Sequence, residues 1–267
     1  MSKAKALGQH FLTDRSILRK IVDILDPKKD ELIIEIGAGK GALTFPLAER
    51  SGKVIAIERD TGLVSFLRES KQKNFLVLEG DVLRVDFRTL VAGETAFPGK
   101  VKLAGNLPYS ISSPLLFKIL EDRDLFSACV FLLQKEVAER LAAQPGSKNF
   151  APLSILFQLH FEIRLRFTLA PGTFSPPPKV QSTLVSLKKR PAPLFVISNE
   201  DGFRRFLRAA FAQRRKTLLN NLKSLPYTPS PLQEALRHLG LKETVRAEQL
   251  AIGQFVTLFD LLIGTKS

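Results

Sequence analysis

The sequence predicts an α/β protein with a doubly wound, mostly parallel sheet and a small all-helical C-terminal domain. Three observations support this prediction. Between residues 32 and 133, short apolar runs alternate with helix-length amphipathic segments, the pattern of parallel strands joined by crossover helices. A glycine-rich turn, Glu35-Ile-Gly-Ala-Gly-Lys-Gly41, follows the first apolar run. Beyond about residue 190 no apolar run of strand length appears, and helical periodicity continues to the end.

Each element can be placed in order along the chain. Parallel strands are predicted at residues 32–36, 53–57, 75–78, 101–104 and 128–133. Helices are predicted at residues 43–50, 61–70, 113–121 and 135–143. Two more strands are expected at residues 153–169 and 183–187, separated by a loop whose three adjacent prolines exclude helix and central strand. We expect two domains, residues 1–190 and 191–267.

Composition places the chain among globular proteins, with a basic surface that either binds a polyanionic partner or only faces solvent. Its 267 residues are 45% hydrophobic and 25% charged, and the formal net charge is +14, which favours nucleic acid as a partner. No apolar stretch is long enough for a membrane span and no apolar leader is present. One cysteine, Cys129, and three histidines offer no zinc-binding spacing. We expect a cytoplasmic monomer without a metal ion or a membrane association.

The carboxyl ends of the first three strands carry groups suited to a nucleoside-containing cofactor. Gly37 and Gly39 permit a tight turn and close approach of a ligand to backbone N–H groups. Glu58 follows Gly37 by 21 residues, where an acid would hold ribose hydroxyls. Asp81 ends the third strand and could accept a hydrogen bond from an adenine amine. This pattern is shared by NAD enzymes and by S-adenosylmethionine enzymes, so it leaves both open.

The fourth strand runs into the most specific stretch, Ala-Gly-Asn106-Leu-Pro-Tyr109. An exocyclic adenine amine is a poor nucleophile because its lone pair is delocalised into the ring. Two acceptors aimed at its N–H bonds would direct the lone pair at an incoming methyl group, and we expect the Asn106 side-chain oxygen and the Leu107 carbonyl to be these acceptors. Pro108 would fix the direction of that carbonyl. Tyr109 would stack on an extruded base.

These residues resemble a known family. Asn106-Leu-Pro-Tyr109 is similar to the catalytic motif of amino-directed nucleic-acid methyltransferases. Three more motifs, Gly8-Gln-His-Phe-Leu12, Glu35-Ile-Gly-Ala-Gly-Lys-Gly41 and Phe174-Ser-Pro-Pro-Pro-Lys-Val180, narrow the resemblance to the ribosomal RNA adenine N6,N6-dimethyltransferases. Within that family they point to the small-subunit enzyme of bacteria and organelles. The resemblance covers nearly the whole chain.

The resemblance implies a Rossmann-like S-adenosylmethionine-dependent methyltransferase domain and a role for each motif. It assigns the cofactor pocket to His10, Leu12, Gly37, Gly39, Glu58, Asp81 and Asn106, with S-adenosylhomocysteine as product. Some family members carry Asn where this chain has His10. It also implies that Phe174 faces the target base, as a partner to Tyr109. The implied reaction adds two methyl groups to N6 of each of two adjacent adenines in small-subunit ribosomal RNA, during biogenesis of the 30S subunit.

The segment from Lys188 to Lys223 is strongly basic, with ten Lys or Arg and two acidic residues. We expect Arg204, Arg208 and Arg215 to share one helix face and grip the RNA backbone. Two alternatives to the small-subunit enzyme stay open here. One is a large-subunit adenine methyltransferase of the antibiotic-resistance type. The other is a ribosome-assembly binding factor for which methylation is secondary.

Overall fold

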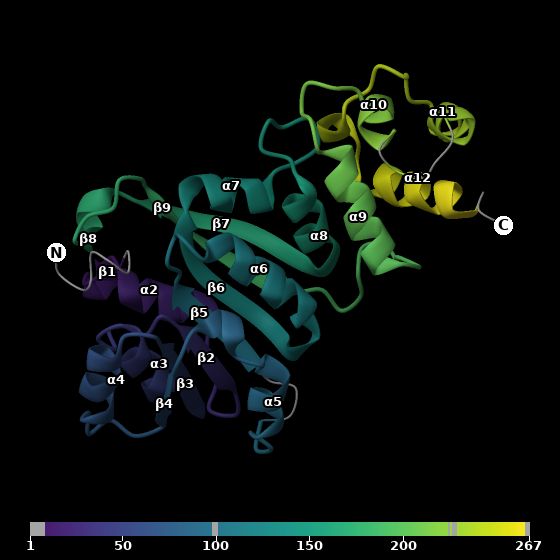
Figure 1. Cartoon of the computed structure of the whole chain (residues 1–267). Coiled ribbons are helices and arrows are strands. Elements are labelled where there is room, and N and C mark those ends of the chain that lie inside the picture. Colours follow the sequence, from purple (N-terminus) through teal and green to yellow (C-terminus); the bar gives the residue numbers. More distant parts are fainter. Residues whose placement is uncertain (1–8, 98–100, 224, 226–228, 265–267) are drawn as a thin grey trace. The chain divides into compact units, whose positions relative to one another are not determined.

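The computed structural model describes residues 9–97, 101–223, 225 and 229–264 (Figure 1). Contacts between residues divide the chain into two compact units. The first comprises the chain up to Ala138 together with Glu162–Lys189, and the second comprises Glu139–Phe161 together with the chain from Arg190 onward. The second boundary of this division lies between Lys189 and Arg190, and two domains of residues 1–190 and 191–267 stay a prediction. Residues 139–161, however, group with the second unit.

The first unit is built on a seven-stranded sheet with the strand order β4-β3-β2-β5-β6-β9-β7 (Figure 1). In chain order the strands are β2 (Leu32–Ile36), β3 (Lys53–Glu58), β4 (Phe75–Glu79), β5 (Val101–Asn106), β6 (Phe126–Gln134), β7 (Phe161–Leu169) and β9 (Ser182–Lys189). The strands from β4 to β6 are parallel, and β9 pairs antiparallel with β6. The chain winds outward from β2 to β4 and then returns to β5 on the other side of β2, which confirms the doubly wound fold.

Helices follow the parallel strands, and all of them except α5 (Phe87–Ala92) are predicted from the sequence. They are α3 (Thr44–Arg50), α4 (Thr61–Arg68), α5 (Phe87–Ala92), α6 (Ser112–Glu121) and α7 (Lys135–Ala142). All five residues of β2 are buried. A strand buried on both faces is typical of a parallel sheet covered by helices on each side.

Helix α2 (Arg15–Leu25), for which we made no prediction, packs on this sheet. The Asp14 carboxylate caps its start by accepting hydrogen bonds from the N–H groups of Ser16 and Ile17. Its buried side chains recur at helical spacing and join the core formed with β6 and β9: Leu18, Ile21, Val22 and Leu25. The helix ends at Asp26, whose φ is +48°.

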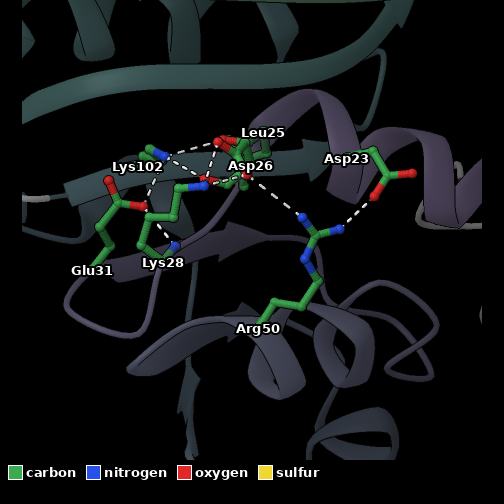
Figure 2. A network of polar contacts seen from close by, with 7 residues as sticks. All are labelled: Asp23, Leu25, Asp26, Lys28, Glu31, Arg50 and Lys102. Atoms are coloured by element: carbon green, nitrogen blue, oxygen red, sulfur yellow. Dashed lines mark hydrogen bonds and ion pairs between the residues drawn. The ribbon is translucent and has the colours of Figure 1, made fainter.

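The amino end of β5 is tied to the C-terminal end of α2 by a polar network (Figure 2). The Lys102 ammonium donates to the carbonyl oxygens of Leu25 and Asp26, at 3.1 and 2.8 Å. It also forms an ion pair with Glu31 at 2.7 Å. Arg50 extends the network to Asp23 and Asp26. Because the last carbonyls of a helix lack partners within it, Lys102 satisfies groups that would otherwise be unpaired.

One predicted strand is wrong in its first half. Residues 153–160 belong to helix α8 (Pro152–His160), and only Phe161–Leu169 forms a strand. Seven of the nine α8 residues are buried, so the helix is apolar on nearly all sides. An apolar run without a polar face cannot be told from a buried strand by its periodicity.

The second unit is helical in its described part, with α8, α9 (Glu200–Ala210), α10 (Leu218–Leu222), α11 (Pro229–His238) and α12 (Ile252–Gly264). Its core contains phenylalanine rings packed edge to face or tilted, with Phe203 and Phe206 of α9 against Phe259 of α12. None of the helices in the described ranges has the length and apolar character needed to cross a membrane.

Candidate active site

A cavity of about 910 Å³, open to solvent, lies where the parallel strands end. Residues from the amino-terminal segment, from the ends of β2 to β5 and from the turns that follow them line it. The lining includes most of the predicted site: His10, Gly37, Gly39, Glu58, Asp81, Asn106, Leu107, Pro108 and Tyr109. This is the position at which doubly wound sheets bind ligands, beside the point where the winding reverses.

The glycine loop after β2 adopts a conformation that side chains disfavour. Gly37, Gly39 and Gly41 have φ values of +74°, +59° and +79°, in the left-handed region. A Cβ atom at Gly39 would lie 3.0 Å from the Phe11 ring. The Gly39 N–H donates to Glu58 Oε2 at 2.8 Å, so the loop is fastened to the end of β3.

Two carboxylates stand at neighbouring strand ends. Glu58 is 4% exposed, and its Oε1 accepts from the N–H groups of Arg59 and Asp60. Among the described residues its Oε2 accepts from Gly39 alone, which leaves capacity for a ligand hydroxyl. Asp81 Oδ1 accepts from the Leu83 N–H at 3.0 Å, and its Oδ2 lies 3.9 Å from Arg59 Nη1.

Asn106 ends β5 with its carboxamide held in one orientation. Its Nδ2 donates to the main-chain carbonyl of His10 at 2.7 Å. Since that carbonyl can only accept, the amide must present nitrogen to it, and Oδ1 is left without a donor among the described residues. The Leu107 N–H donates to Leu132, whereas the Leu107 carbonyl has no partner in the same part of the chain.

The residues that follow support this turn. The Pro108 carbonyl accepts from the Ile111 N–H and the Ser112 hydroxyl. The half-buried Tyr109 ring lies 5.6 Å, centroid to centroid, from the His10 ring. Burial raises the pKa of the Tyr109 hydroxyl, and a hydrogen bond with Ser182 opposes that rise.

Phe174 and Leu12 lie elsewhere. The short strand β1 (Phe11–Leu12) pairs antiparallel with β8 (Phe174–Ser175). Both side chains are turned into the hydrophobic core and are 4% and 5% exposed, and neither lines the main cavity. The expectation that Phe174 faces the target base is therefore corrected, because its ring is packed in the core. Leu12 borders an adjoining cavity instead. Gly8, the first residue of the amino-terminal motif, lies outside the described residues.

Phe11, Ser182 and Pro176 are among the residues of this region that sequence reasoning missed. Phe11 lines the main cavity beside Gly39. The residues on either side of it, His10 and Leu12, were predicted from the sequence, but Phe11 itself was not. Ser182 holds the Tyr109 hydroxyl, a pairing across 73 residues that no local pattern signals. Pro176 offers its carbonyl to His10 Nδ1 at 2.7 Å.

Glu35, the first residue of the glycine-rich motif, is a buried acid. It borders the adjoining cavity of about 590 Å³, and its Oε2 has no hydrogen-bond partner in the described chain. The pKa of this carboxyl is raised to about 8: burial is the main cause, Thr44 opposes the rise, and the nearby Glu58 carboxylate adds to it.

The three predicted arginines of the basic segment do not share one helix face. Arg204 and Arg208 lie on α9, whereas Arg215 lies beyond its end at Ala210. The Arg204 side chain is 25% exposed and stands 3.9 Å from Glu200. Arg208 and Arg215 are exposed, and Arg215 borders a surface hollow with Gln213, Arg214 and Lys216. In the described residues, no group of three or more His, Cys, Asp or Glu side chains is placed to hold a metal ion.

Comparison with known proteins places this geometry in context. The family model described as ribosomal RNA adenine dimethylase matches residues 1–263. A protein of Geobacter metallireducens named ribosomal RNA small subunit methyltransferase A is 45% identical over 258 residues, which are 95% of this chain and 93% of that protein. A protein of the same name from Syntrophus aciditrophicus is 45% identical over 263 residues, covering 97% and 93% of the two chains.

Two solved structures resemble this one over nearly their whole length. A dimethyladenosine transferase from Plasmodium falciparum aligns with a TM-score of 0.78 and 30% identity, over 93% of this chain and 96% of that one. The 23S rRNA methyltransferase ErmE aligns with a TM-score of 0.72 over 95% and 99% of the chains, but at 24% identity it shows the fold alone. These findings confirm the resemblance drawn from the four motifs, and they set aside the NAD alternative.

Proposed function

Because the chain belongs to the ribosomal RNA adenine dimethylase family, we propose that it transfers two methyl groups from S-adenosylmethionine to adenine N6 in small-subunit ribosomal RNA. The names of the relatives at 45% identity support the small subunit as the target. The dimethyladenosine transferase structure supports the double transfer. The immature 30S subunit as the bound form, and two adjacent adenines as the targets, belong to the same proposal, as do a monomeric state and action in the cytoplasm.

The observation that carries the proposal is the pair of unpaired acceptors at the end of β5. Asn106 Oδ1 and the Leu107 carbonyl have no donor among the described residues and belong to residues that line one cavity. An adenine amine has two N–H bonds to donate. Accepting both would draw the nitrogen lone pair out of conjugation and aim it at the methyl donor. Acceptors fixed in advance need no reorganisation when the methyl group moves.

The cavity also fits the cofactor. Glu58 Oε2 has capacity for ribose hydroxyls, Asp81 Oδ2 is available for the adenine amine, and Gly37 and Gly39 keep side chains out of the space near the loop. When bound, S-adenosylmethionine supplies a methyl group already activated by its sulfonium, so the proposal includes no metal ion.

Two further groups have roles on the RNA side of the proposal. The Tyr109 ring lines the cavity and offers a face on which an extruded base can stack. Arg208 and Arg215 are exposed and suit phosphate contacts, which would position the RNA without reading its sequence. The Arg204 charge is offset by Glu200, so we give it a smaller part.

The experiment is methylation by the purified protein of small-subunit precursor particles and, separately, of protein-free large-subunit RNA. Digestion and mass spectrometry would then identify the methylated nucleoside. The proposal expects N6,N6-dimethyladenosine in the small-subunit RNA. Asn106→Ala serves as the matched protein control. Methylation confined to large-subunit RNA would contradict the proposal and favour the resistance-type activity.

A further inference from the structure

The Tyr109 ring is fastened at its hydroxyl by a residue far away in the sequence. Its hydroxyl oxygen lies 2.6 Å from Ser182 Oγ, which is the shorter part of the range for hydroxyl pairs. Ser182 is the first residue of β9 and is fully buried, at 0% exposure. β9 pairs along its length with β6, so this partner sits on a rigid element of the sheet.

A second contact limits the ring from the side of the amino-terminal segment. The His10 ring lies 5.6 Å from the Tyr109 ring at an interplanar angle of 34°. His10 is itself held, because its Nδ1 donates to the Pro176 carbonyl at 2.7 Å. Tyr109 is therefore constrained at its hydroxyl by β9 and along its ring by His10. Tyr109 also lines the main cavity.

We infer that Ser182 is a positioning residue for methyl transfer, which fixes the Tyr109 ring as a preset platform for the target adenine. This inference rests on the proposed function. Without the Ser182 hydroxyl, the ring keeps its apolar contacts but loses the bond that sets its tilt. A base stacked on a loosened ring reaches the two acceptors in the correct orientation less often. The effect should be larger for the second transfer, because the same base must then be presented again with a bulkier amine.

The neighbouring residue offers a matched control. Thr183 is also buried, at 3% exposure. Its hydroxyl makes a bond of the same kind, 3.0 Å from the Thr168 hydroxyl, but Thr183 does not line the main cavity. Thr183→Val thus removes a part-buried hydroxyl pair one residue further along β9. It should reproduce the structural cost of Ser182→Ala without touching Tyr109.

The kinetic test compares Ser182→Ala, Tyr109→Phe, their double variant and Thr183→Val. Ser182→Ala and Tyr109→Phe should each lower kcat/KM for RNA about three- to tenfold, the effect of one hydrogen bond. The double variant should be no worse than either single one, because both remove the same bond. The share of N6-monomethyladenosine in the product should rise, while S-adenosylmethionine affinity should not change. Thr183→Val should leave the product ratio at the wild-type value.

A spectroscopic test does not depend on activity. The chain has two tyrosines, so incorporation of 3-fluorotyrosine gives two fluorine resonances, and Tyr227→Phe assigns the one from Tyr109. Ser182→Ala should shift or broaden that resonance, and Thr183→Val should not. If Ser182→Ala does not fold, Tyr109→Phe still removes the same bond in the kinetic test.

The outcomes separate the two claims. An unmoved resonance, or a product ratio that Ser182→Ala and Thr183→Val change equally, would overturn the role of Ser182 and leave the proposed function intact. If the wild-type protein methylates no small-subunit RNA, the proposed function fails. The fluorine resonance then decides alone whether Ser182 fixes the ring.

Discussion

The two ends of strand β5 differ in how completely their polar atoms are paired. At the amino end, the three donors of the Lys102 ammonium meet two helix carbonyls and the Glu31 carboxylate (Figure 2). At the carboxyl end, Asn106 uses its amide nitrogen and leaves its oxygen unpaired, and the Leu107 carbonyl is likewise without a donor in the described chain. At the amino end of β5 the polar groups are paired within the protein, whereas at the carboxyl end two acceptors remain able to bind a ligand.

The largest effect on activity should come from removing the unpaired Asn106 side-chain oxygen. Asn106→Ala should lower kcat about 10²- to 10³-fold, as loss of a preorganised group at the reacting atoms does. Its stability cost should be small, about 1 kcal/mol for the bond to His10. Steady-state kinetics and calorimetric binding of S-adenosylmethionine would measure both. Equal losses of kcat and cofactor affinity would mean that Asn106 serves mainly to bind the cofactor.

At the amino end of β5, a substitution should lower stability and leave kcat nearly unchanged. Lys102→Met leaves Glu31 and two helix carbonyls without their partner, so it should cost about 2–4 kcal/mol of unfolding free energy. The kcat of the folded fraction should stay near the wild-type value. Urea unfolding and activity at low temperature would measure the two quantities. A fall in kcat without a loss of stability would remove the distinction between the ends of β5.

A smaller effect, on RNA binding, is expected in the second unit. There an arginine with an acidic partner can be compared with two arginines for which the described residues show no ion pair. Replacing Arg208 and Arg215 together by Gln should weaken RNA binding and flatten its dependence on salt by about one to two counterions. Arg204→Gln is the control, because Glu200 already offsets that charge. Binding isotherms at several salt concentrations would measure the slopes. A slope that the double variant leaves unchanged would mean that these arginines only face solvent.

The last prediction concerns stability alone and the buried acid beside the glycine loop, Glu35, whose Oε2 has no hydrogen-bond partner among the described residues. The pKa of Glu35 is raised from 4.5 to about 8 in the folded chain, so the folded state binds its proton more tightly than the unfolded chain does. Stability from this group is therefore full below about pH 4.5 and is lost progressively as the pH rises to about 8.

Glu35→Gln lacks this titration and is the test of it. The melting temperature of the variant minus that of the wild-type protein should increase between pH 5 and pH 8 and change little above that. Thermal unfolding at a series of pH values would measure the difference. A difference that is constant across the series would contradict a raised pKa for this carboxyl.

The sequence predicted most of this site because its signals are local. Strands β2 to β6, the glycine loop and the Asn106 turn each have a pattern within a few residues. The contacts that bind the turn to the rest of the molecule are not local: the His10 carbonyl reaches Asn106 across 96 residues, and Ser182 reaches Tyr109 across 73. The spacing of residues within one segment cannot predict a hydrogen bond between two residues so far apart in the sequence.

The errors have physical causes as well. Phe174 lies within a proline-rich loop and precedes its three adjacent prolines, a position that predicts a ring held ready for stacking. Its backbone pairs with Leu12 instead, and the ring is buried in the core. Helix α8 is apolar on nearly all sides, so its sequence lacks the alternation of apolar and polar residues by which a helix is recognised. Arg215 was placed by helical spacing on a helix that ends at Ala210, because no glycine or proline follows to mark the end.

The bond that orients the Asn106 carboxamide comes from a main-chain oxygen, that of His10. A backbone atom is the same whatever side chain it carries, so exchanging His10 for Asn does not redirect the amide. What does redirect it is a slip of the short ladder that holds Phe11 opposite Ser175. Deleting one residue between positions 9 and 14 should therefore harm methyl transfer more than any replacement at position 10, since the aim of the amide depends on the length of the chain there.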